Sequence, residues 1–301
     1  MGNDLRSVVV FGIGEIGRPL VEEFLSHGYS VRAVTRQGSQ NPSVRSVEEA
    51  GATIVQVDYR DEKSLESAIR GTDIVISTLS GPAFAYQVAL AKVAKRESVK
   101  LFVPSMWGFD YENPRFKDPK RNPPMIKEKY DLLEELNTLG LPWFAFSNGL
   151  FTSWMLSSVH GIDAKSCTIR WAGRGDKLVT FTHLRDVAAF VQLAISRIPI
   201  PQPGTGRWLY VESFRATFND VFAEAQRLDG TRRQWTMTRS SADDARQTQT
   251  SDSEQGEIAW HLALFDDGDG LRAENDNKLV GFEPKYDFAN AVQETLLQER
   301  K

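Results

Sequence analysis

A turn containing three glycines near the N-terminus is the part of the sequence best suited to bind phosphate. The segment Gly12–Gly17 (Gly-Ile-Gly-Glu-Ile-Gly) directly follows the apolar stretch Ser7–Phe11 and opens a helical pattern. In such turns Gly12 permits the tight bend, Gly14 lets backbone N–H groups approach a pyrophosphate, and Gly17 lets helix and strand pack closely. The helix N-terminus adds a partial positive charge, so the strand–turn–helix context predicts a dinucleotide site. The residues of this predicted site are Gly12, Gly14, Glu15, Ile16 and Gly17.

The end of the next predicted strand, Ser30–Val34, indicates which dinucleotide would bind. A site for NAD usually places Asp or Glu there, where the carboxylate binds the 2′-hydroxyl of the ribose. This chain instead has Thr35 and Arg36 and no acidic residue. The planar guanidinium of Arg36 can bind a 2′-phosphate, so the sequence predicts NADP(H) as the cofactor. The alternative is that Arg36 is an ordinary surface arginine.

Two further strand ends would border the same crevice. Asp58 ends the predicted strand Thr53–Val57, and could accept a hydrogen bond from an adenine amino group or cap the turn before Asp61. In open parallel sheets, ligands bind outside the carboxyl ends of the strands. The residues expected beside the cofactor at the end of the fourth strand are Thr78, Leu79 and Ser80.

Strands and helices alternate along the first half of the chain. The predicted strands are Ser7–Phe11, Ser30–Val34, Thr53–Val57, Ile74–Thr78, Lys100–Val103 and Pro142–Phe146. The predicted helices between them are Arg18–His27, Val44–Ala50, Lys63–Ile69, Ala83–Lys95 and Met125–Leu139. This alternation is typical of βαβ units, and the right-handed crossover rule then favours an α/β fold with a Rossmann doubly wound parallel sheet.

The pattern is less regular after Gly149. The expected elements there are strands Leu178–Phe181 and Trp208–Val211 and helices Asp186–Ser196, Phe218–Leu228, Glu257–Phe265 and Asp287–Leu297. We expect Asp186 to cap its helix. The segment Thr231–Gly256 is polar and has no clear period, so we predict a mobile loop or an exposed helix.

These patterns suggest two domains. We expect residues 1–150 to form an NADP-binding Rossmann domain, with residues 178–212 returning to it. Residues 213–301 and 151–177 would form a smaller C-terminal lobe that binds the substrate.

Composition limits the function classes. The chain of 301 residues is 41% hydrophobic and 25% charged, which is ordinary for a globular protein. Its net charge of −4 gives no electrostatic reason to expect a nucleic acid or an anionic membrane as partner. No apolar stretch approaches the ~20 residues of a membrane-spanning helix, and the N-terminus has no apolar signal core. With Cys167 as its one cysteine, the chain can form no internal disulfide, and we expect a cytoplasmic protein.

No metal site is predicted. The four histidines have no ligand spacing. The segment Asp266–Gly270 (Asp-Asp-Gly-Asp-Gly) is similar to a calcium loop but lacks its later acidic ligands, so we interpret it as a turn.

Several segments resemble the NmrA-like and isoflavone reductase-like family, an atypical branch of the short-chain dehydrogenase/reductases. Besides the glycine turn, they are Val31–Arg36, Gly51–Asp58, Gly71–Ser77, Gln87, Phe102–Gly108 (Phe-Val-Pro-Ser-Met-Trp-Gly), Leu141–Trp143, Ser147–Phe151, Thr182–Val187 and Gly206–Glu212. The resemblance covers about residues 7–228. The chain departs from the family at Phe11, where a glycine is common, and at Met106, where a glutamate is usual, and the second departure leaves the substrate open.

The resemblance implies a catalytic lysine on the helix before the sixth strand. Counting back from Leu141 without a gap places it at Lys129, with Lys127 as the rival. The Tyr-x-x-x-Lys pair of ordinary short-chain dehydrogenases occurs only as Tyr59–Lys63, which lies in the wrong part of the fold. A lysine ammonium can donate a proton to a developing oxyanion while hydride arrives from the nicotinamide, and burial would lower its pKa.

The resemblance also implies contacts for the nicotinamide and the substrate. Asn148 and Phe151 are expected to face the nicotinamide. The candidates to line the substrate pocket are Trp107, Tyr111, Trp154 and His160.

These residues imply an NADPH-dependent reductase of a small aromatic or polyketide-like substrate, with Lys129 as the proton donor. Two alternatives stay open. One is a non-catalytic NADP(H)-sensing regulator of the NmrA type, and the other is a redox-neutral cyclase or condensing enzyme of a natural-product pathway. The expected partner is a small molecule rather than a nucleic acid or a membrane, and a homodimer is left open.

Overall fold

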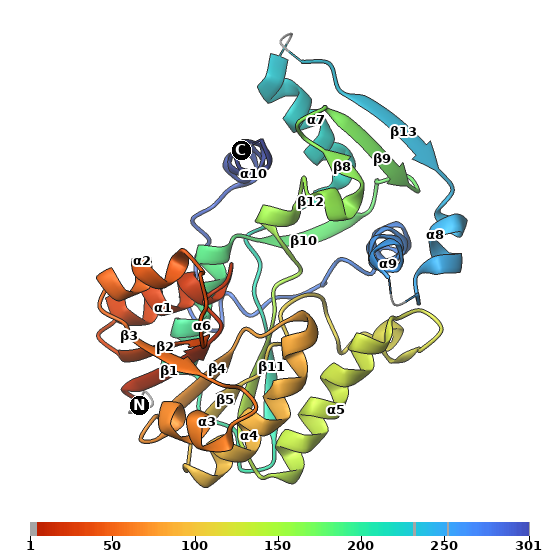
Figure 1. Cartoon of the computed structure of the whole chain (residues 1–301). Helices are drawn as coiled ribbons and strands as arrows, with labels where there is room; N and C mark the ends of the chain where they lie inside the picture. The colour runs from red at the N-terminus through yellow and green to blue at the C-terminus, as the bar shows by residue number, and fades with distance from the viewer. Residues whose placement is uncertain (1–4, 231–232, 252, 301) are drawn as a thin grey trace.

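The computed structural model describes residues 5–230, 233–251 and 253–300. Its centre is a sheet of seven parallel strands in the order β3-β2-β1-β4-β5-β6-β11 (Figure 1). The strands are β1 Ser7–Phe11, β2 Ser30–Arg36, β3 Thr53–Val57, β4 Ile74–Ser77, β5 Leu101–Val103, β6 Trp143–Ser147 and β11 Gly206–Tyr210. The strand order reverses between β1 and β4, so a crevice opens at their carboxyl ends. This arrangement confirms the predicted Rossmann doubly wound sheet.

Helices cover both faces of the sheet (Figure 1). One face carries α1 Gly17–Ser26, α2 Ser43–Glu49 and α6 Leu184–Arg197, and the other carries α3 Glu62–Ile69, α4 Gln87–Arg96 and α5 Pro124–Thr138. Strand β1 explains the two layers, because Val8 and Val10 belong to the first apolar core while Val9 and Phe11 belong to the second. A parallel strand buried on both sides is apolar at nearly every position, as Ser7–Phe11 is.

A smaller lobe lies beyond the carboxyl ends of the strands (Figure 1). It contains two three-stranded sheets, β12-β10-β7 and β13-β9-β8. Their strands are β7 Leu150–Phe151, β8 Ile162–Asp163, β9 Thr168–Ala172, β10 Leu178–Thr182, β12 Phe214–Thr217 and β13 Thr236–Ser240. The helices of the lobe are α7 Phe218–Asp229, α8 Ala242–Thr248, α9 Glu254–Asp267 and α10 Phe288–Glu299. Short 3₁₀ turns connect several elements: η1 Gly81–Tyr86, η2 Pro114–Lys117, η3 Thr152–Trp154 and η4 Ser158–His160.

The boundary between the two parts differs from the expected one. Helix α6 and strand β11 do pack with the main sheet, but β10 pairs with β12 and β7 in the lobe. The late residues Val280 and Phe282 return to the α6 face of the main sheet. The chain therefore crosses between the two parts more often than the sequence pattern indicates.

Asp186 is not the cap of α6. The helix starts two residues earlier, and the side chain of His183 accepts the capping hydrogen bond. Asp186 is buried in the first turn, where its carboxylate accepts hydrogen bonds from Ser213 Oγ at 2.6 Å and Lys285 N at 3.0 Å. The carboxylate of Asp186 thus links helix α6 to the segments that contain Ser213 and Lys285.

The segment Thr231–Gly256 is neither a loop nor a single helix. Its described part contains strand β13, which pairs in parallel with β9, then helix α8 and the start of α9. Residues 231, 232 and 252 of this segment lie outside the described residues. All five residues of β13 are exposed, so the strand shows no alternation of apolar and polar positions.

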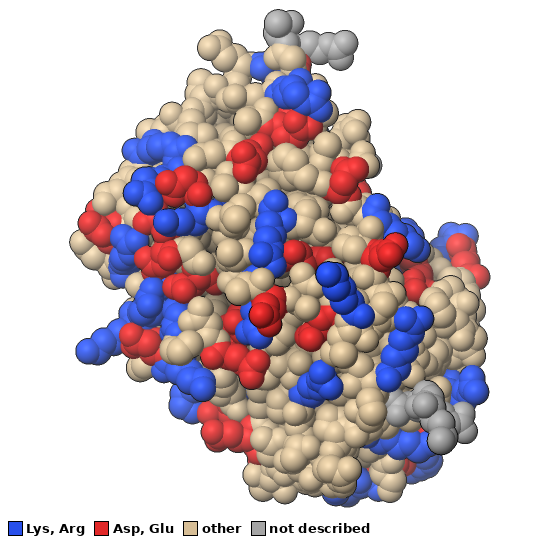
Figure 2. All heavy atoms as spheres, turned by 180° about the vertical axis from the view of Figure 1, so that it is seen from behind, with Lys and Arg blue, Asp and Glu red and all other residues tan. Residues whose placement is uncertain are grey.

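Surface charge is mixed on the face seen in Figure 2, where basic and acidic side chains are interspersed. Within the described ranges, no helix is long and apolar enough to cross a membrane.

Candidate functional site

The glycine turn has the backbone geometry that a phosphate site needs. Gly12 has φ +95°, and a Cβ on Gly17 would lie 2.0 Å from Gly12 O, so only glycine permits this approach of α1 to the turn. A Cβ on Gly14 would meet no atom within 4 Å, so that position faces open space. Thr78 Oγ1 donates to Gly12 O at 2.9 Å and ties the turn to the end of β4. These observations fit a pyrophosphate bound against the backbone at Gly14 and the N-terminus of α1.

A cavity of about 660 Å³ extends from this turn along the carboxyl ends of the strands to the lobe. Most of the residues predicted for the site line it. They are Gly14, Glu15, Ile16, Thr78, Leu79, Ser80, Trp107, Tyr111, Lys129, Phe151 and Trp154. The structure thus brings the glycine turn, Lys129 and a set of aromatic rings to one cavity.

Helix α5 places Lys129, and not Lys127, in the cavity. Lys129 lies on the buried face of the helix with Ile126, Leu132 and Leu136. Lys127 is two positions away, about 200° around the helix, where it is exposed and pairs with Asp131 at 2.5 Å. The predicted register is therefore the one that reaches the cavity.

One carbonyl and one aromatic ring contact the ammonium of Lys129. Its Nζ donates to Trp107 O at 3.2 Å and lies 4.5 Å from the ring centroid of Tyr111. No carboxylate pairs with it among the described residues. Burial lowers the pKa of Lys129 from 10.5 to about 7, because removing an ammonium from water disfavours its charged form.

The strand ends hold Trp107 and its neighbours in place. The Trp107 ring stacks on Phe146, with centroids 5.9 Å apart, and its Nε1 donates to Ser77 O at 3.3 Å. Gln87 contributes from α4, since its Oε1 accepts from Ser105 N at 2.8 Å. The carbonyl that bonds Lys129 is therefore fixed by two strands and a helix.

Asn148 does not line the cavity. Its side chain is fully buried, accepts from Gly108 N at 3.0 Å and donates to Gly149 O at 3.1 Å. The bond with Gly108 connects the loops after β5 and β6, so Asn148 supports the cavity wall from behind, whereas we expected it to face the cofactor. Its neighbour Phe151 does reach the cavity.

His160 is also not a lining residue. It is fully buried behind the wall, with its ring 5.2 Å from His261 and 5.7 Å from Phe218. Neither of its ring nitrogens has a hydrogen-bond partner among the described residues. Burial lowers its pKa well below the usual value, so the ring is neutral. His160 contacts Trp154 and His261, which do line the cavity, so it lies behind the wall rather than in it.

Helix α9 contributes cavity residues that were not predicted. Glu257, Trp260 and His261 line the cavity on the side of the lobe. Every residue from Ala259 to Phe265 is buried, which is typical of a helix enclosed on all sides. The apolar run predicted a helix there, but its pattern does not indicate which side meets the site.

Trp154 connects the lobe to the glycine turn. Its Nε1 donates to Glu15 Oε2 at 2.9 Å, so an indole of the lobe holds the acidic side chain of the turn. This bond joins the lobe to the α/β domain beside the large cavity.

Arg36 and Asp58 lie at the carboxyl ends of β2 and β3 and are exposed. Asp58 Oδ1 accepts from Arg60 N at 2.9 Å, so it does cap the turn that follows β3. The side chain of Arg36 makes no hydrogen bond or ion pair with a described residue and is exposed at the end of β2.

The aspartates of the segment Asp266–Gly270 bind arginines. Helix α9 ends at Asp267, and Gly268 follows with φ +83°. Asp267 accepts hydrogen bonds from Arg115 and Arg121, each at 2.6 Å. The described residues contain no group of three or more His, Cys, Asp or Glu that could hold a metal ion.

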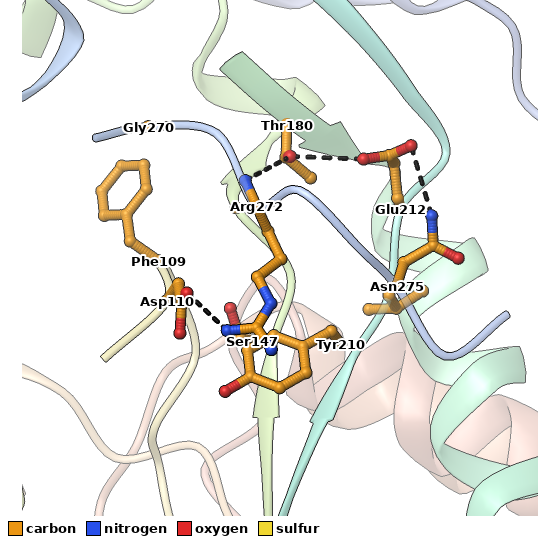
Figure 3. A pocket seen from close by; sticks show the side chains of 11 residues that line it. Phe109, Asp110, Ser147, Thr180, Tyr210, Glu212, Gly270, Arg272 and Asn275 are labelled. Atoms are coloured by element: carbon orange, nitrogen blue, oxygen red, sulfur yellow. Dashed lines mark hydrogen bonds and ion pairs between the residues drawn. The ribbon is translucent and has the colours of Figure 1, made fainter. Parts of the chain in front are cut away.

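A second, much smaller cavity of about 10 Å³ lies between the domain and the lobe (Figure 3). Arg272 bonds Asp110 at 2.5 Å, and its guanidinium lies 3.6 Å from the ring centroid of Tyr210. The volume is about that of one water. This small cavity is part of the junction between the domain and the lobe and is too small for a substrate.

Known proteins are similar to this chain in sequence and in fold. Isoflavone reductase homolog IRL of Zea mays is 29% identical over 198 residues, which are 63% of this chain and 63% of that protein. Oxidoreductase aprR of Aspergillus flavus is 27% identical over 233 residues, 75% of each chain. The match thus spans less than two thirds of the length of the maize protein. The solved binary complex of leucoanthocyanidin reductase from Vitis vinifera with NADPH has a TM-score of 0.78 at 18% identity, and the match covers 97% of this chain and 99% of that one.

The matched range of one family model contains the glycine turn, Lys129 and the seven strands of the main sheet. The model of the NmrA-like family matches residues 5–223, and the chain therefore belongs to the NmrA-like family.

Proposed function

We propose that this protein is an NADPH-dependent reductase of a small aromatic or polyketide-like substrate. The observation that carries the proposal is Lys129, which is buried in the large cavity with a pKa of about 7. An ammonium without a carboxylate partner is costly to bury, so a lysine in this position needs a reason other than stability.

The cofactor proposal rests on the fit of the turn. Gly14 leaves the space that a pyrophosphate needs, and Arg36 offers a guanidinium at the end of β2 where the 2′-phosphate of NADPH would lie. The Vitis vinifera neighbour, which has the same fold, is a complex with NADPH. When bound, NADPH supplies a hydride to the substrate.

The proposed role of Lys129 is to balance that hydride with a proton. As hydride adds to an electron-poor carbon of the substrate, negative charge develops on a conjugated oxygen. Lys129 Nζ donates a proton to this oxygen and becomes neutral, and solvent then returns the proton. The carbonyl of Trp107, 3.2 Å away, orients the ammonium without neutralising it.

The same observation argues against the sensor but not against a redox-neutral enzyme. A redox sensor needs the glycine turn and Arg36 but has no use for a buried lysine of lowered pKa. A redox-neutral cyclase or condensing enzyme could use Lys129, but would not consume NADPH.

The test is NADPH oxidation, followed by absorbance, with a panel of quinones and aromatic enones and ketones. We expect Lys129→Ala to lower turnover by about 10²–10⁴-fold, as for the loss of a general acid, while NADPH still binds. The matched control is Lys127→Ala, which removes a lysine from the exposed side of the same helix and should change turnover less than about twofold.

Full activity of Lys129→Ala would reject the proton-donor role. Tight NADPH binding without turnover of any compound would favour the sensor. Conversion of a substrate without NADPH loss would favour the redox-neutral enzyme.

A further inference from the structure

Helix α9 presents the polar ring of His261 to the large cavity in a group of aromatic rings. His261 lines the cavity, and the neighbouring rings are Phe109 at 6.1 Å, Trp154 at 6.4 Å and Trp260 at 4.8 Å between centroids. A site of this composition favours a flat aromatic ligand, because offset and edge-to-face contacts between rings stabilise it. The imidazole of His261 adds a hydrogen-bonding group to this site, so it can distinguish between aromatic ligands.

The hydrogen bond that His261 makes within α9 shows which of its ring nitrogens is a donor and which is an acceptor. Its Nδ1 lies 3.0 Å from Glu257 O, one turn earlier in α9. A carbonyl oxygen only accepts, so Nδ1 carries the hydrogen and Nε2 of the neutral ring is an acceptor. No described residue donates to Nε2, and His261 is a lining residue of the cavity. The nitrogen left for a ligand is therefore Nε2.

The surroundings keep this ring neutral. Burial lowers the pKa of His261 to about 4. Behind it lies His160, whose ring is 5.2 Å away and is neutral as well. No carboxylate contacts either ring among the described residues, so no anion favours an imidazolium. His261 therefore remains a hydrogen-bond acceptor throughout the neutral pH range.

We propose that Nε2 of His261 accepts a hydrogen bond from a hydroxyl group of the aromatic substrate, so that the cavity selects hydroxylated arenes over their methyl ethers. The inference rests on the proposed function only in taking this cavity as the substrate site. An ether oxygen cannot donate, and placing it against Nε2 leaves the buried nitrogen without a partner. Lys129 and His261 thus have different tasks, because Lys129 supplies a proton during the reaction while His261 orients the substrate before it.

The experiment measures binding, so it does not depend on turnover. 2-Naphthol and 2-methoxynaphthalene are titrated calorimetrically into the protein, with and without saturating NADP⁺. The two probes differ in the hydrogen-bond donor. We expect the wild type to bind 2-naphthol about three- to tenfold more tightly, the effect of one net hydrogen bond.

Three variants locate the preference. His261→Phe keeps a ring but removes the acceptor, so both probes should bind within about twofold of each other. His261→Gln restores an acceptor and should recover part of the preference. The matched control is His160→Phe, which changes the ring behind the wall and should keep the preference of the wild type.

NADPH affinity and the thermal midpoint of each variant report whether it folds. Equal binding of the two probes to the wild type, binding of neither, or a preference that survives in His261→Phe would overturn the inference. If His261→Phe does not fold, His261→Leu, which also lacks an acceptor, replaces it, and a preference that survives in that variant overturns the inference. Turnover without a hydroxyl preference would reject this inference alone, whereas a hydroxyl preference without turnover would reject the proposed reductase alone.

Discussion

The pH dependence of turnover should follow the ionisation of the buried ammonium group of Lys129. Burial lowers its pKa to about 7, and the protonated form is the proton donor. We therefore expect kcat/KM to be constant below this pKa and to fall about tenfold per pH unit above it. The measurement is kcat/KM from about pH 5.5 to 9 for the wild type and for Lys127→Ala, which should share one profile.

Whether kcat/KM falls or rises with pH distinguishes a proton donor from a base at Lys129. A base would need the neutral amine, and kcat/KM would then rise through the same pH range. A rising profile would contradict the donor role while keeping Lys129 in the active site.

Arg36 is the residue that we expect to favour NADPH over NADH. Its exposed guanidinium lies at the end of β2, where NAD-binding proteins usually have an acidic residue. We expect NADPH to bind more tightly than NADH by about 1.5–3 kcal/mol, the range of a charge-assisted hydrogen bond. Arg36→Ala should remove most of this difference and leave NADH affinity nearly unchanged. Calorimetric titration of both cofactors tests it, and equal affinities in the wild type would contradict it.

Individual residues differed in how well the sequence predicted them. Lys129 could be named because the family resemblance implies a lysine at that distance before Leu141, and in the structure it is buried with Ile126, Leu132 and Leu136. His261 could not, because α9 is buried on all sides and its pattern marks no face for the cavity. Asn148 lies next to the cavity in sequence, but its side chain turns inward to bond Gly108.

At the scale of elements, the sequence predicts those whose burial leaves a local pattern. The inner strands β1, β4 and β5 are nearly all apolar because both faces are covered, and the glycine turn has a local geometric requirement. Strand β13 has neither property, since all its residues are exposed and its partner β9 is distant in the chain. Helix α6 began earlier than expected because the ring of His183 caps it.

Helix α8 is held to the lobe by Arg246. This side chain bonds Asp266 at 2.7 Å and Asp267 at 2.8 Å, at the end of α9. We expect backbone hydrogens of α8 to exchange more slowly than those of the exposed strand β13, since exposed, weakly packed backbone opens more easily. Arg246→Ala should bring the exchange of α8 close to that of β13.

Hydrogen exchange with mass spectrometry, read at peptides of residues 236–240 and 242–248, measures this difference. The control is Arg239→Ala, which removes an arginine from β13 and should leave α8 unchanged. Slow exchange of α8 in Arg246→Ala would show that packing on α9, and not the ion pairs, holds it.

At the scale of the molecule, the large cavity exists only where the α/β domain and the lobe meet. The domain supplies the glycine turn and Lys129, and the lobe supplies Trp154 and His261. The relative position of the two parts therefore determines the distance between the proposed proton donor and the proposed substrate acceptor. Sequence patterns describe each part but not this distance, because the contacts between the parts join residues far apart in the chain.

Arg115 forms buried ion pairs between the two parts. Its side chain, 1% exposed, extends from the loop after β5 to Asp267 at 2.6 Å and Asp269 at 3.2 Å, both at the end of α9. Its Nη2 also donates to Gln249 Oε1 at 3.2 Å. Breaking a buried ion pair by removing one partner typically costs about 3–5 kcal/mol, because the other charge stays buried. Arg121 and Arg246 still contact Asp267, so we expect Arg115→Met to lower the free energy of unfolding by the smaller amount of about 2–4 kcal/mol.

The control is Arg121→Met, which removes a partner of the same two aspartates whose side chain is 38% exposed. Solvent screens such a pair, so we expect a loss of only about 0–1 kcal/mol. Urea unfolding of both variants measures the difference, and equal losses would contradict it. Because Arg115 holds the helix that carries His261, Arg115→Met should also raise KM for the substrate while NADPH affinity stays constant. An unchanged KM together with the loss of stability would mean that the cavity keeps its shape without this contact.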